Sequence, residues 1–319
     1  MPINDQCIRW QPTAEFGARR LRADLYRYIR DYFSEQGVLE VETPLLSSAA
    51  NSDPAIESIT ADAGGHCRYL RTSPEFPLKR LLCHHSSAIY ELGKVFRASE
   101  QGSSHNPEFT MLEWYRPGWD HLQLADEVIE LVSGSTKRSL NVQRLSYQDL
   151  FDDALGIDAL DGKTDDIVAA AEKRGAPTGL NKQQALDYLL SAVIAPSFGN
   201  RQLTLITGFP AAQAALSRID PNDARVCQRF ELYVGSAELA NGYHELTDPA
   251  EQARRFQSDQ QTRQRNGQAV SVLDQRLIAA LQAGLESCAG VAVGIDRWLM
   301  WLGGYDRIGQ VLNFDWESA

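Results

Sequence analysis

Residues 89–115, IYELGKVFRASEQGSSHNPEFTMLEWY, decide the fold, because they predict two β-strands joined by a polar loop. Arg97 closes the first strand, and the second strand carries Glu113 and Tyr115 two positions apart. Residues two apart in a strand point to the same face. A buried carboxylate beside a phenol is costly unless it binds a cation, and an arginine next to a polar loop suits a phosphate. This segment therefore predicts an anion site and a cation site side by side.

The composition is that of an ordinary globular protein with room for one large domain. The chain has 319 residues, of which 43% are hydrophobic and 23% charged. No apolar run approaches the roughly 20 residues that span a bilayer. The N-terminal segment MPINDQCIRWQP has no apolar signal-peptide core, so we expect a cytoplasmic protein with no membrane partner.

The net charge of −11 argues against extensive nucleic-acid contact, because proteins that bind a phosphate backbone usually present a basic surface. The cysteines are scattered and form no CxxC pair, which favours free thiols over a zinc site or a disulfide framework. They are Cys7, Cys67, Cys83, Cys227 and Cys288.

Hydrophobic spacing predicts several helices and strands around the opening segment. The predicted helices cover residues 14–36, 74–84, 122–132, 249–266 and 274–283. The predicted strands cover residues 38–46 and 203–210, a hairpin over 229–246, and a strand within 290–304 that runs into a helix at Ile295. Strands mostly follow one another without βαβ alternation, which predicts an α+β fold with an antiparallel sheet.

Residues 134–200 differ in character from the rest. Helical stretches at 165–173 and 183–195 alternate there with breaks rich in Gly, Pro and Asn. We predict a small helical insertion within a single domain.

The strand-to-helix junction within residues 290–304 is a candidate ligand site. Gly290, Ala292 and Gly294 leave little side-chain bulk on one face of the strand, where a flat ligand has room. Arg297 follows in the first turn of the helix, where a cation opposes the helix dipole unless an anion meets it. Taken alone, close packing with a surface arginine is the commoner explanation.

Two further groups of residues in the 229–246 hairpin favour cations. Glu231 and Glu238 flank its turn, and facing carboxylates need a cation such as Mg²⁺ between them. Two solvated glutamates would explain the pair equally well. Asn241, Tyr243 and Glu245 share one strand face and, with the opening segment, suit an alkylammonium ion. Half-buried strand residues with ordinary partners are the alternative.

Glu75 lies in the first turn of a predicted helix, after Thr72, Ser73 and Pro74. Helix capping and ligand binding compete as explanations for this segment. The sequence has no Walker P-loop, GxGxxG or GxSxG motif. A nucleotide would therefore bind on a sheet, held by arginines.

Taken together, these residues resemble the catalytic domain of a class II aminoacyl-tRNA synthetase, most closely that of the lysine-specific branch. Motif 1 is similar to helix 14–36 with VLEVETPLL, motif 2 to FRAS…HNPEFTMLEWY, and motif 3 to GVAVGIDRW. The segment ELANGYHELTD also matches the lysyl enzymes. The resemblance covers nearly the whole chain, and its motifs recur in order at fitting distances.

Motif 1 begins within the first few dozen residues, where a lysyl-tRNA synthetase would carry an anticodon-binding OB domain. We therefore expect one catalytic domain over residues 1–319, without anticodon binding. The chain resembles the lysyl-tRNA synthetase paralogues that modify translation elongation factor P. That resemblance implies an ATP-dependent ligase that activates (R)-β-lysine and attaches it to a lysine ε-amine of the factor. Because elongation factor P is expected to be acidic too, docking requires a local basic patch, which the sequence does not locate.

Two positions in the implied amino-acid pocket depart from the lysyl enzymes, which typically have Ala at Ser73 and Gly at Ala292. A change of methyl size is worth about 1–3 kcal/mol of discrimination, enough to favour a β-amino acid. Motif 2 departs from both families, because Ser99 stands where a glutamate usually reads the adenine amino group. Glu100 is displaced by one position, and the loop from Ala98 to Ser104 lacks the arginine often found there.

The resemblance also implies roles for individual residues. Mg²⁺ would lie on Glu231 and Glu238, and the catalytic residues would be Arg97 and Arg297. The implied ATP-binding residues are Arg97, Ala98, Ser99, Glu100, His105, Asn106, Phe109, Glu238, Leu239, Gly294 and Arg297. The implied amino-acid-binding residues are Ser73, Pro74, Glu75, Glu113, Tyr115, Asn241, Tyr243, Glu245 and Ala292. The resemblance at motif 1 implies a homodimer.

Two other functions remain open from the sequence. One is a stand-alone lysyl-tRNA synthetase-like core that charges tRNA, against which the missing anticodon recognition argues. The other is a non-catalytic paralogue that senses an amino acid, which the displaced motif 2 glutamate favours. Retention of both arginines and both hairpin glutamates argues against such a sensor.

Overall fold

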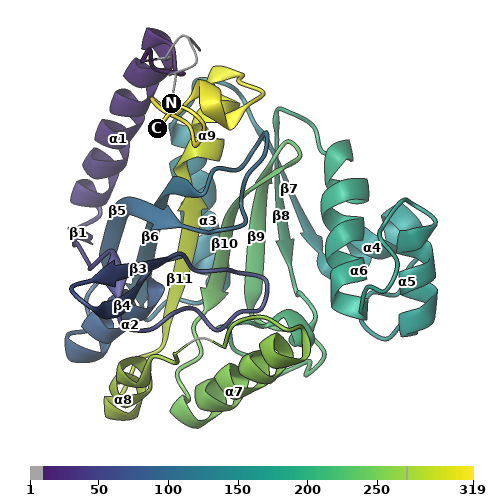
Figure 1. The fold of residues 1–319 in the computed structure, drawn as a ribbon. Helices are drawn as coiled ribbons and strands as arrows, with labels where there is room; N and C mark the ends of the chain where they lie inside the picture. The colour runs from purple at the N-terminus through teal and green to yellow at the C-terminus, as the bar shows by residue number, and fades with distance from the viewer. Residues whose placement is uncertain (1–9, 271) are drawn as a thin grey trace, which may run out of the picture.

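The computed structural model describes residues 10–270 and 272–319, so the expectation of a free thiol at Cys7 lies outside the described residues. A central eight-stranded sheet has helices on both faces (Figure 1). Its strands, in spatial order, are β1 (Leu39–Glu40), β5 (Ile89–Phe96), β6 (Glu108–Pro117), β11 (Cys288–Gly294), β10 (Ala237–His244), β9 (Arg229–Val234), β8 (Gln202–Thr207) and β7 (Asn141–Ser146).

The remaining elements surround this sheet. A small second sheet consists, in spatial order, of β2 (Leu46–Ser47), β4 (His66–Leu70) and β3 (Thr60–Ala63). The helices are α1 (Phe16–Glu35), α2 (Glu75–His84), α3 (His121–Gly134), α4 (Tyr147–Leu155), α5 (Thr164–Glu172), α6 (Lys182–Tyr188), α7 (Pro249–Arg265), α8 (Gln275–Ala283) and α9 (Ile295–Gly303). A π-helical turn (Leu189–Ile194) and 3₁₀ turns at Ala195–Ser197, Ala211–Gln213 and Ile308–Gln310 complete the description. None of the described helices is long and apolar enough to cross a membrane.

The predicted α+β fold is confirmed, with two differences in the sheet. Neighbouring strands from β5 to β8 are antiparallel, but the outermost pairs, β1 with β5 and β7 with β8, are parallel. The strand predicted over 38–46 is reduced to β1 and β2. Pro44 lies between them and cannot donate a ladder hydrogen bond.

One face of the central sheet is apolar and holds the main core. Leu112 and Trp114 of β6 and Val291 and Val293 of β11 are buried there against α1, α3 and α9. The ring of Phe33 in α1 meets that of Trp114 edge-on, with centroids 5.3 Å apart. This packing fixes the sheet beneath the opposite, polar face.

The start of α9 is held rigidly against the sheet. Asp296, in its first turn, is buried and accepts a 2.7 Å hydrogen bond from the Thr110 amide of β6. Its carboxylate also pairs with Arg22 of α1. Because an acid is favourable at a helix N-terminus, this contact defines where α9 begins and where Arg297 emerges.

The segment 134–200 forms a lobe beyond the β7 edge of the sheet (Figure 1). It is mostly helical, as predicted, but it begins with β7, which extends the central sheet. The sequence of β7 was not expected to form a strand because its side chains are largely exposed and show no alternation of burial. Tyr147 and Phe151 of α4 pack in one cluster with Ile206 of β8 and Tyr233 of β9.

Candidate active site

The strand register sets polar residues in one row across the central sheet. Glu91 of β5 pairs with Glu113 of β6, and Glu113 pairs with Ala292 of β11. Ala292 pairs in turn with Asn241 of β10, and Asn241 with Glu231 of β9. Directly paired residues point to the same side of a sheet. We call this side the polar face.

A second row lies beside the first on the same face. Gly290 of β11 pairs with Tyr115 of β6 and with Tyr243 of β10. A Cβ atom on Gly290 would lie 2.3 Å from Cε1 of Tyr115 and 2.4 Å from Oε1 of Glu245. Only glycine therefore fits here, and the phenol and the carboxylate converge above it. We call this region the amino-acid end, after the role that the resemblance implies for its residues.

Glu113 and Tyr115, predicted to share a face, are in direct contact. The Tyr115 hydroxyl donates a 2.8 Å hydrogen bond to Oε1 of Glu113, and both side chains are buried. Burial, with the nearby charge of Glu75 as the next cause, raises the pKa of Glu113 to about 8. A carboxyl group held this far above its ordinary range favours the arrival of a cation.

Lys79, which the sequence interpretation missed, occupies the centre of the amino-acid end. Its side chain is 1% exposed, and its Nζ lies 2.6 Å from Oε1 of Glu75 and 2.6 Å from Oε2 of Glu245. Burial raises the pKa of Glu245 to about 7, although Lys79 opposes that shift. Glu75 and Lys79 are four residues apart on α2, a spacing that predicts such a pair. Glu245 thus already contacts one resident ammonium group.

The other residues expected around an amino acid lie close by. The Oγ atom of Ser73 accepts a 2.9 Å hydrogen bond from the Glu75 amide, after Pro74 at the N-terminus of α2. Asn241 accepts a 3.2 Å hydrogen bond from Nε of Arg229. Arg229, also missed from the sequence, lies 5.9 Å from the ring centroid of Tyr243.

Arg97 lies at the other end of the polar face, which we call the nucleotide end. Its guanidinium carbon is 5.2 Å from the ring centroid of Phe109, and Nη1 lies 2.9 Å from Oε1 of Glu100. Its Nε atom is buried and has no hydrogen-bond partner among the described residues. A buried donor without a partner is costly, so Arg97 has capacity for a further acceptor.

Arg297 approaches the same place from α9. Its Nη1 donates a 2.8 Å hydrogen bond to the backbone oxygen of Glu238, and its Nη2 bonds to Nε2 of His105. Burial lowers the pKa of His105, and the guanidinium groups of Arg297 and Arg97 lower it further. His105 is therefore neutral near pH 7, and the two arginines predicted to act together lie on the same side of the molecule.

The motif 2 departure has a structural counterpart. The hydroxyl of Ser99 donates a 2.9 Å hydrogen bond to Oε2 of Glu57, and the amide of Ala98 bonds to the backbone oxygen of Glu57. A carboxylate from a distant loop thus lies next to Ser99, while Glu100 pairs with Arg97.

Three of the residues expected to bind ATP differ in what they offer to a ligand on the polar face. The amide of Asn106 is occupied by the backbone, donating to the Glu108 oxygen at 2.7 Å and accepting from the Trp316 amide at 2.9 Å. Leu239 is buried in the main core, so its side chain faces away from the polar face. Gly294 leaves open space, because its nearest neighbour to an added Cβ is Arg297 at 3.9 Å.

The two hairpin glutamates are close but are not cross-strand partners, contrary to the simplest expectation. A bulge between Glu238 and Ala240 pairs Glu238 with Tyr233. Glu231 accepts a 2.9 Å hydrogen bond from the Tyr233 hydroxyl and pairs with Arg229. Burial and then the charge of Glu238 raise the pKa of Glu231 to about 7.

Repelling carboxylates of this kind fit a hard divalent cation such as Mg²⁺. No group of three or more metal-ligating side chains occurs among the described residues, so phosphate oxygens would have to complete the coordination.

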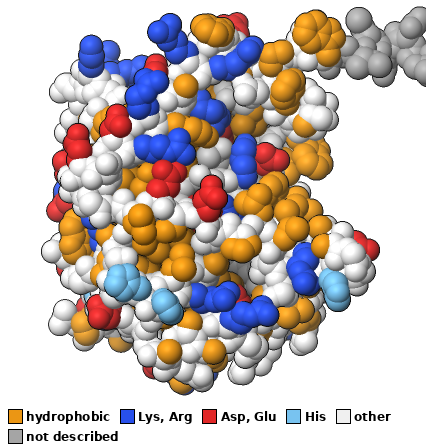
Figure 2. Space-filling model, turned by 90° about the vertical axis from the view of Figure 1, so that its left-hand side faces the viewer, with side chains coloured by type: hydrophobic (Ala, Val, Ile, Leu, Met, Phe, Trp, Pro, Cys, Tyr) orange, Lys and Arg blue, Asp and Glu red, His pale blue; other side chains and the backbone are white. Residues whose placement is uncertain are grey.

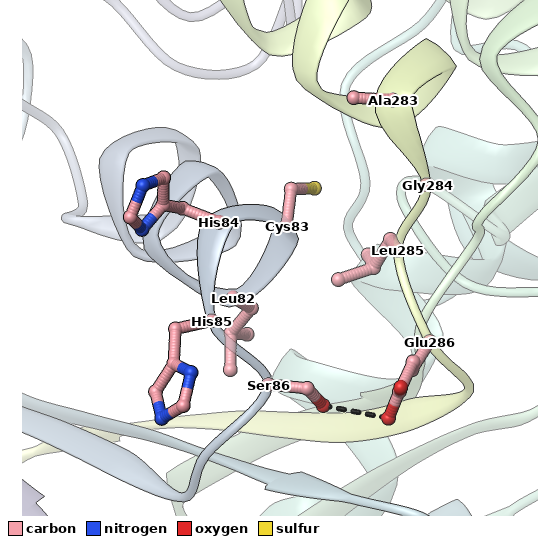
Figure 3. Close-up of a pocket in the computed structure, with 9 residues that line it drawn as sticks. All are labelled: Leu82, Cys83, His84, His85, Ser86, Ala283, Gly284, Leu285 and Glu286. Atoms are coloured by element: carbon pink, nitrogen blue, oxygen red, sulfur yellow. Dashed lines mark hydrogen bonds between the residues drawn. The ribbon is translucent and has the colours of Figure 1, made fainter.

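A hollow of about 590 Å³ lies where α2 and α8 end (Figure 3). The rings of His84 and His85 point away from the segment that carries Glu286, and Ser86 bonds to Glu286 at 2.7 Å. No set of reactive groups converges in this hollow, so it is not a candidate active site.

Comparisons with known proteins identify the family of this chain. The family model for class II tRNA synthetases (D, K and N) matches residues 15–317. An elongation factor P–(R)-β-lysine ligase of Vibrio cholerae is 43% identical over 320 residues, covering 97% of this chain and 98% of that protein. The ligase of the same name from Mannheimia succiniciproducens is 41% identical over 318 residues, with 97% and 98% covered. The chain belongs to the class II tRNA synthetases and, among them, to the family of the elongation factor P–(R)-β-lysine ligases.

Proposed function

We propose that this protein uses ATP to activate (R)-β-lysine and then transfers it to the ε-amine of a lysine of translation elongation factor P. Membership of the family and the name shared by the relatives support the reaction type. The charge of the amino-acid end supports the substrate class. We further propose that the protein works in the cytoplasm, where translation factors act.

The count of charges at the amino-acid end is the observation that carries this proposal. Three buried or half-buried carboxylates, those of Glu75, Glu113 and Glu245, lie at this end with one resident ammonium group, that of Lys79, which contacts Glu75 and Glu245. The pKa values of Glu113 and Glu245 are raised to about 8 and about 7, and once all three carboxyl groups are ionised two negative charges are left for a ligand to compensate. A diamino acid brings two ammonium groups, so lysine or β-lysine would neutralise the pocket, whereas an amino acid with one ammonium group would not.

Two residues beside these carboxylates support the β-isomer. Ala292 lies between Glu113 and Asn241 in the first row of the polar face. Its methyl group takes space where the backbone end of an amino acid would rest. Ser73 adds a hydroxyl group next to Glu75. Together they favour an amino group one carbon further along the chain.

Activation at the nucleotide end requires charge stabilisation and positioning. A carboxylate oxygen of β-lysine attacks the α-phosphorus of ATP, the bond to the pyrophosphate oxygen breaks, and an aminoacyl-adenylate forms. Arg97 holds the α-phosphate and stabilises its developing negative charge. Arg297 and the neutral His105 hold the β- and γ-phosphates.

Glu231 and Glu238 are the residues that would hold Mg²⁺. The ion would neutralise phosphate charge when bound. Arg229 keeps Glu231 paired until then.

Transfer follows without an enzyme nucleophile. The ε-amine nitrogen of the acceptor lysine attacks the acyl carbon, AMP leaves, and the amine loses a proton as the amide bond forms. The polar face has only to hold the adenylate and admit the acceptor.

We also propose a homodimer formed through α1 and the β1 edge. Large apolar side chains are exposed there, among them Phe16 (73%) and Leu39 (61%). An edge strand of two residues beside such a surface suits an interface between copies.

One experiment tests the reaction and separates it from its rivals. The protein is incubated with ATP, labelled α-lysine or (R)-β-lysine, and either elongation factor P or tRNA. We expect label on elongation factor P, and more from (R)-β-lysine. Label on tRNA would support a charging enzyme instead, and amino-acid binding without pyrophosphate exchange would support a sensor.

A further inference from the structure

A cavity of about 320 Å³ opens beside the amino-acid end of the polar face. It lies between the small sheet, the first turns of α2 and the start of α8, and its wall includes Ser73 and Glu75. Figure 2 shows Lys and Arg side chains over the upper part of this side of the molecule and in a band across its lower part. Because Ser73 and Glu75 are in the wall, a ligand seated in the cavity would touch the place where the activated amino acid is expected.

The wall of this cavity is positively charged. It is lined by four arginines, of which Arg71 is neutralised by Glu91 at 2.5 Å. Among the described residues, Arg68 and Arg276 bond only to neutral oxygens and Arg80 bonds to none. Arg68 donates to the backbone oxygen of Cys67 at 3.1 Å, and Arg276 donates to Oγ of Ser48 at 2.6 Å.

In the part of the chain that the structure describes, no carboxylate lies within the 4.0 Å ion-pair distance of Arg68, Arg80 or Arg276. The two acids in the wall are already engaged. Glu75 pairs with Lys79, and Asp274 accepts hydrogen bonds from the amides of Arg276 at 2.9 Å and Leu277 at 3.1 Å.

Three arginines without an ion pair, against the single unpaired carboxylate of Asp274 in the same wall, are unexpected in a chain of net charge −11. Like charges held together repel unless an anion joins them. Guanidinium groups bind carboxylates and phosphates best, because their planar donors match two oxygens at once. The cavity therefore fits an anionic partner.

A protein partner fits better than a nucleic acid. A nucleic-acid backbone needs cations along an extended track, whereas the unpaired arginines are confined to one cavity in an acidic protein. A few acidic side chains on a loop would suffice to fill it.

We propose that this arginine-lined cavity receives acidic side chains of the acceptor protein and so brings the acceptor lysine to the amino-acid end. This inference rests on the proposed function, and it supplies the local basic patch that an acidic acceptor requires. The cavity lies beside the activation site, so the surface that docks the acceptor is separate from the residues that bind ATP.

The test is the double charge reversal Arg80→Glu/Arg276→Glu. Both arginines are exposed. The matched control, Lys173→Glu/Arg174→Glu, makes the same change in net charge at exposed positions in the insertion. Pyrophosphate exchange with (R)-β-lysine measures activation. Transfer of labelled β-lysine to elongation factor P, over a range of acceptor and salt concentrations, measures docking.

We expect pyrophosphate exchange within about twofold of the parent for both variants. The cavity variant should lose about tenfold or more in kcat/KM for the acceptor, mainly through KM, and its salt dependence should flatten. The control should transfer normally. An acidic-to-lysine substitution on the acceptor should restore transfer by the cavity variant.

Normal transfer by the cavity variant, or an equal loss in the control, would overturn this inference and leave the proposed function intact. Loss of pyrophosphate exchange in the cavity variant would place these arginines in the activation site and also overturn it. A parent protein without any exchange would instead overturn the proposed function. If the cavity variant lost tRNA charging, the partner would be a nucleic acid.

Discussion

The two ends of the polar face differ in how far their charged side chains are buried and in how those charges are paired. At the amino-acid end, Glu113, Lys79 and Glu245 are buried, Lys79 pairs with Glu245, and Tyr115 donates a hydrogen bond to Glu113. At the nucleotide end, Arg97 and Arg297 are about a quarter exposed and rest on partners that a ligand can displace. The amino-acid end is pre-organised without a ligand and suits discrimination between amino acids. The nucleotide end is more open and suits the highly charged ATP of the proposed reaction, which must enter and leave in every catalytic cycle.

The largest expected effect is at the nucleotide end, with Arg97→Ala. If Arg97 stabilises charge at the α-phosphate, pyrophosphate exchange should fall about 100- to 1,000-fold, as when one donor to a transition-state oxyanion is removed. Amino-acid binding should be unchanged, which separates the two ends. Unaltered exchange would remove Arg97 from the α-phosphate.

The amino-acid end should respond through stability as well as activity. Lys79→Met leaves Glu75 and Glu245 without their buried cation and should lower the free energy of unfolding by about 3–5 kcal/mol. Lys79→Met/Glu245→Gln removes the charge pair together and should recover part of that loss. Denaturant unfolding of the single and double variants measures the coupling, expected at about 0.5–3 kcal/mol. Strictly additive losses would contradict the pairing.

Substrate choice should follow the bulk next to Glu113. Ala292→Gly combined with Ser73→Ala should move the ratio of kcat/KM for (R)-β-lysine over α-lysine toward α-lysine by about 1–3 kcal/mol. Pyrophosphate exchange with each isomer gives the ratio. A parent protein that activates α-lysine better than (R)-β-lysine would contradict this role for Ala292 and Ser73.

The two ends should also differ in how they respond to pH. Glu113 and Glu245 have pKa values of about 8 and about 7, so each must lose its proton to bind an ammonium group. The KM for the amino acid should therefore fall as the pH rises from 6 to 8. The fall should be at most about tenfold per pH unit for each carboxyl proton that is released on binding. The distal ammonium group of the ligand stays charged, because the ordinary pKa of a lysine side chain is about 10.4.

Glu113→Gln is the control for that profile, since it removes the carboxyl group with the higher pKa of the two and should flatten the dependence. A KM that rises with pH would contradict the assignment.

The smallest effect concerns the loop carboxylate beside Ser99. Glu57→Gln keeps the shape but removes the charge next to the place where a glutamate usually reads adenine. We expect the ratio of KM values for GTP over ATP to fall by about fivefold, equivalent to one hydrogen bond of about 1 kcal/mol. Glu100→Gln serves as the comparison, and an effect confined to Glu100→Gln would assign the adenine contact to that residue.

Much of this molecule could be predicted from local patterns. Strands with alternating side chains, such as FTMLEWY, and helices with regular apolar spacing, such as residues 16–35, were placed correctly because one face of each is buried. The strand β7 was missed because its side chains are exposed at the edge of the sheet, where burial leaves no pattern.

Most of the polar partners could not be predicted because they come from distant segments. Lys79 and Glu57 meet Glu245 and Ser99 only after the sheet has formed, whereas Arg229 and Glu231 lie two residues apart on β9. The spacing of Glu75 and Lys79 indicates a helical pair, but nothing local shows that Glu245, more than 150 residues later, completes it.

Gly290 limits how far the substrate range of this protein can be engineered. Variant libraries that aim to accept bulkier diamino acids commonly randomise every residue near the ligand, but any side chain at this position would collide with Tyr115 and Glu245. Randomisation should instead be confined to neighbouring positions of the first row, such as position 292, where the protein already has a methyl group. A library designed in this way would contain fewer variants with a steric clash at Gly290.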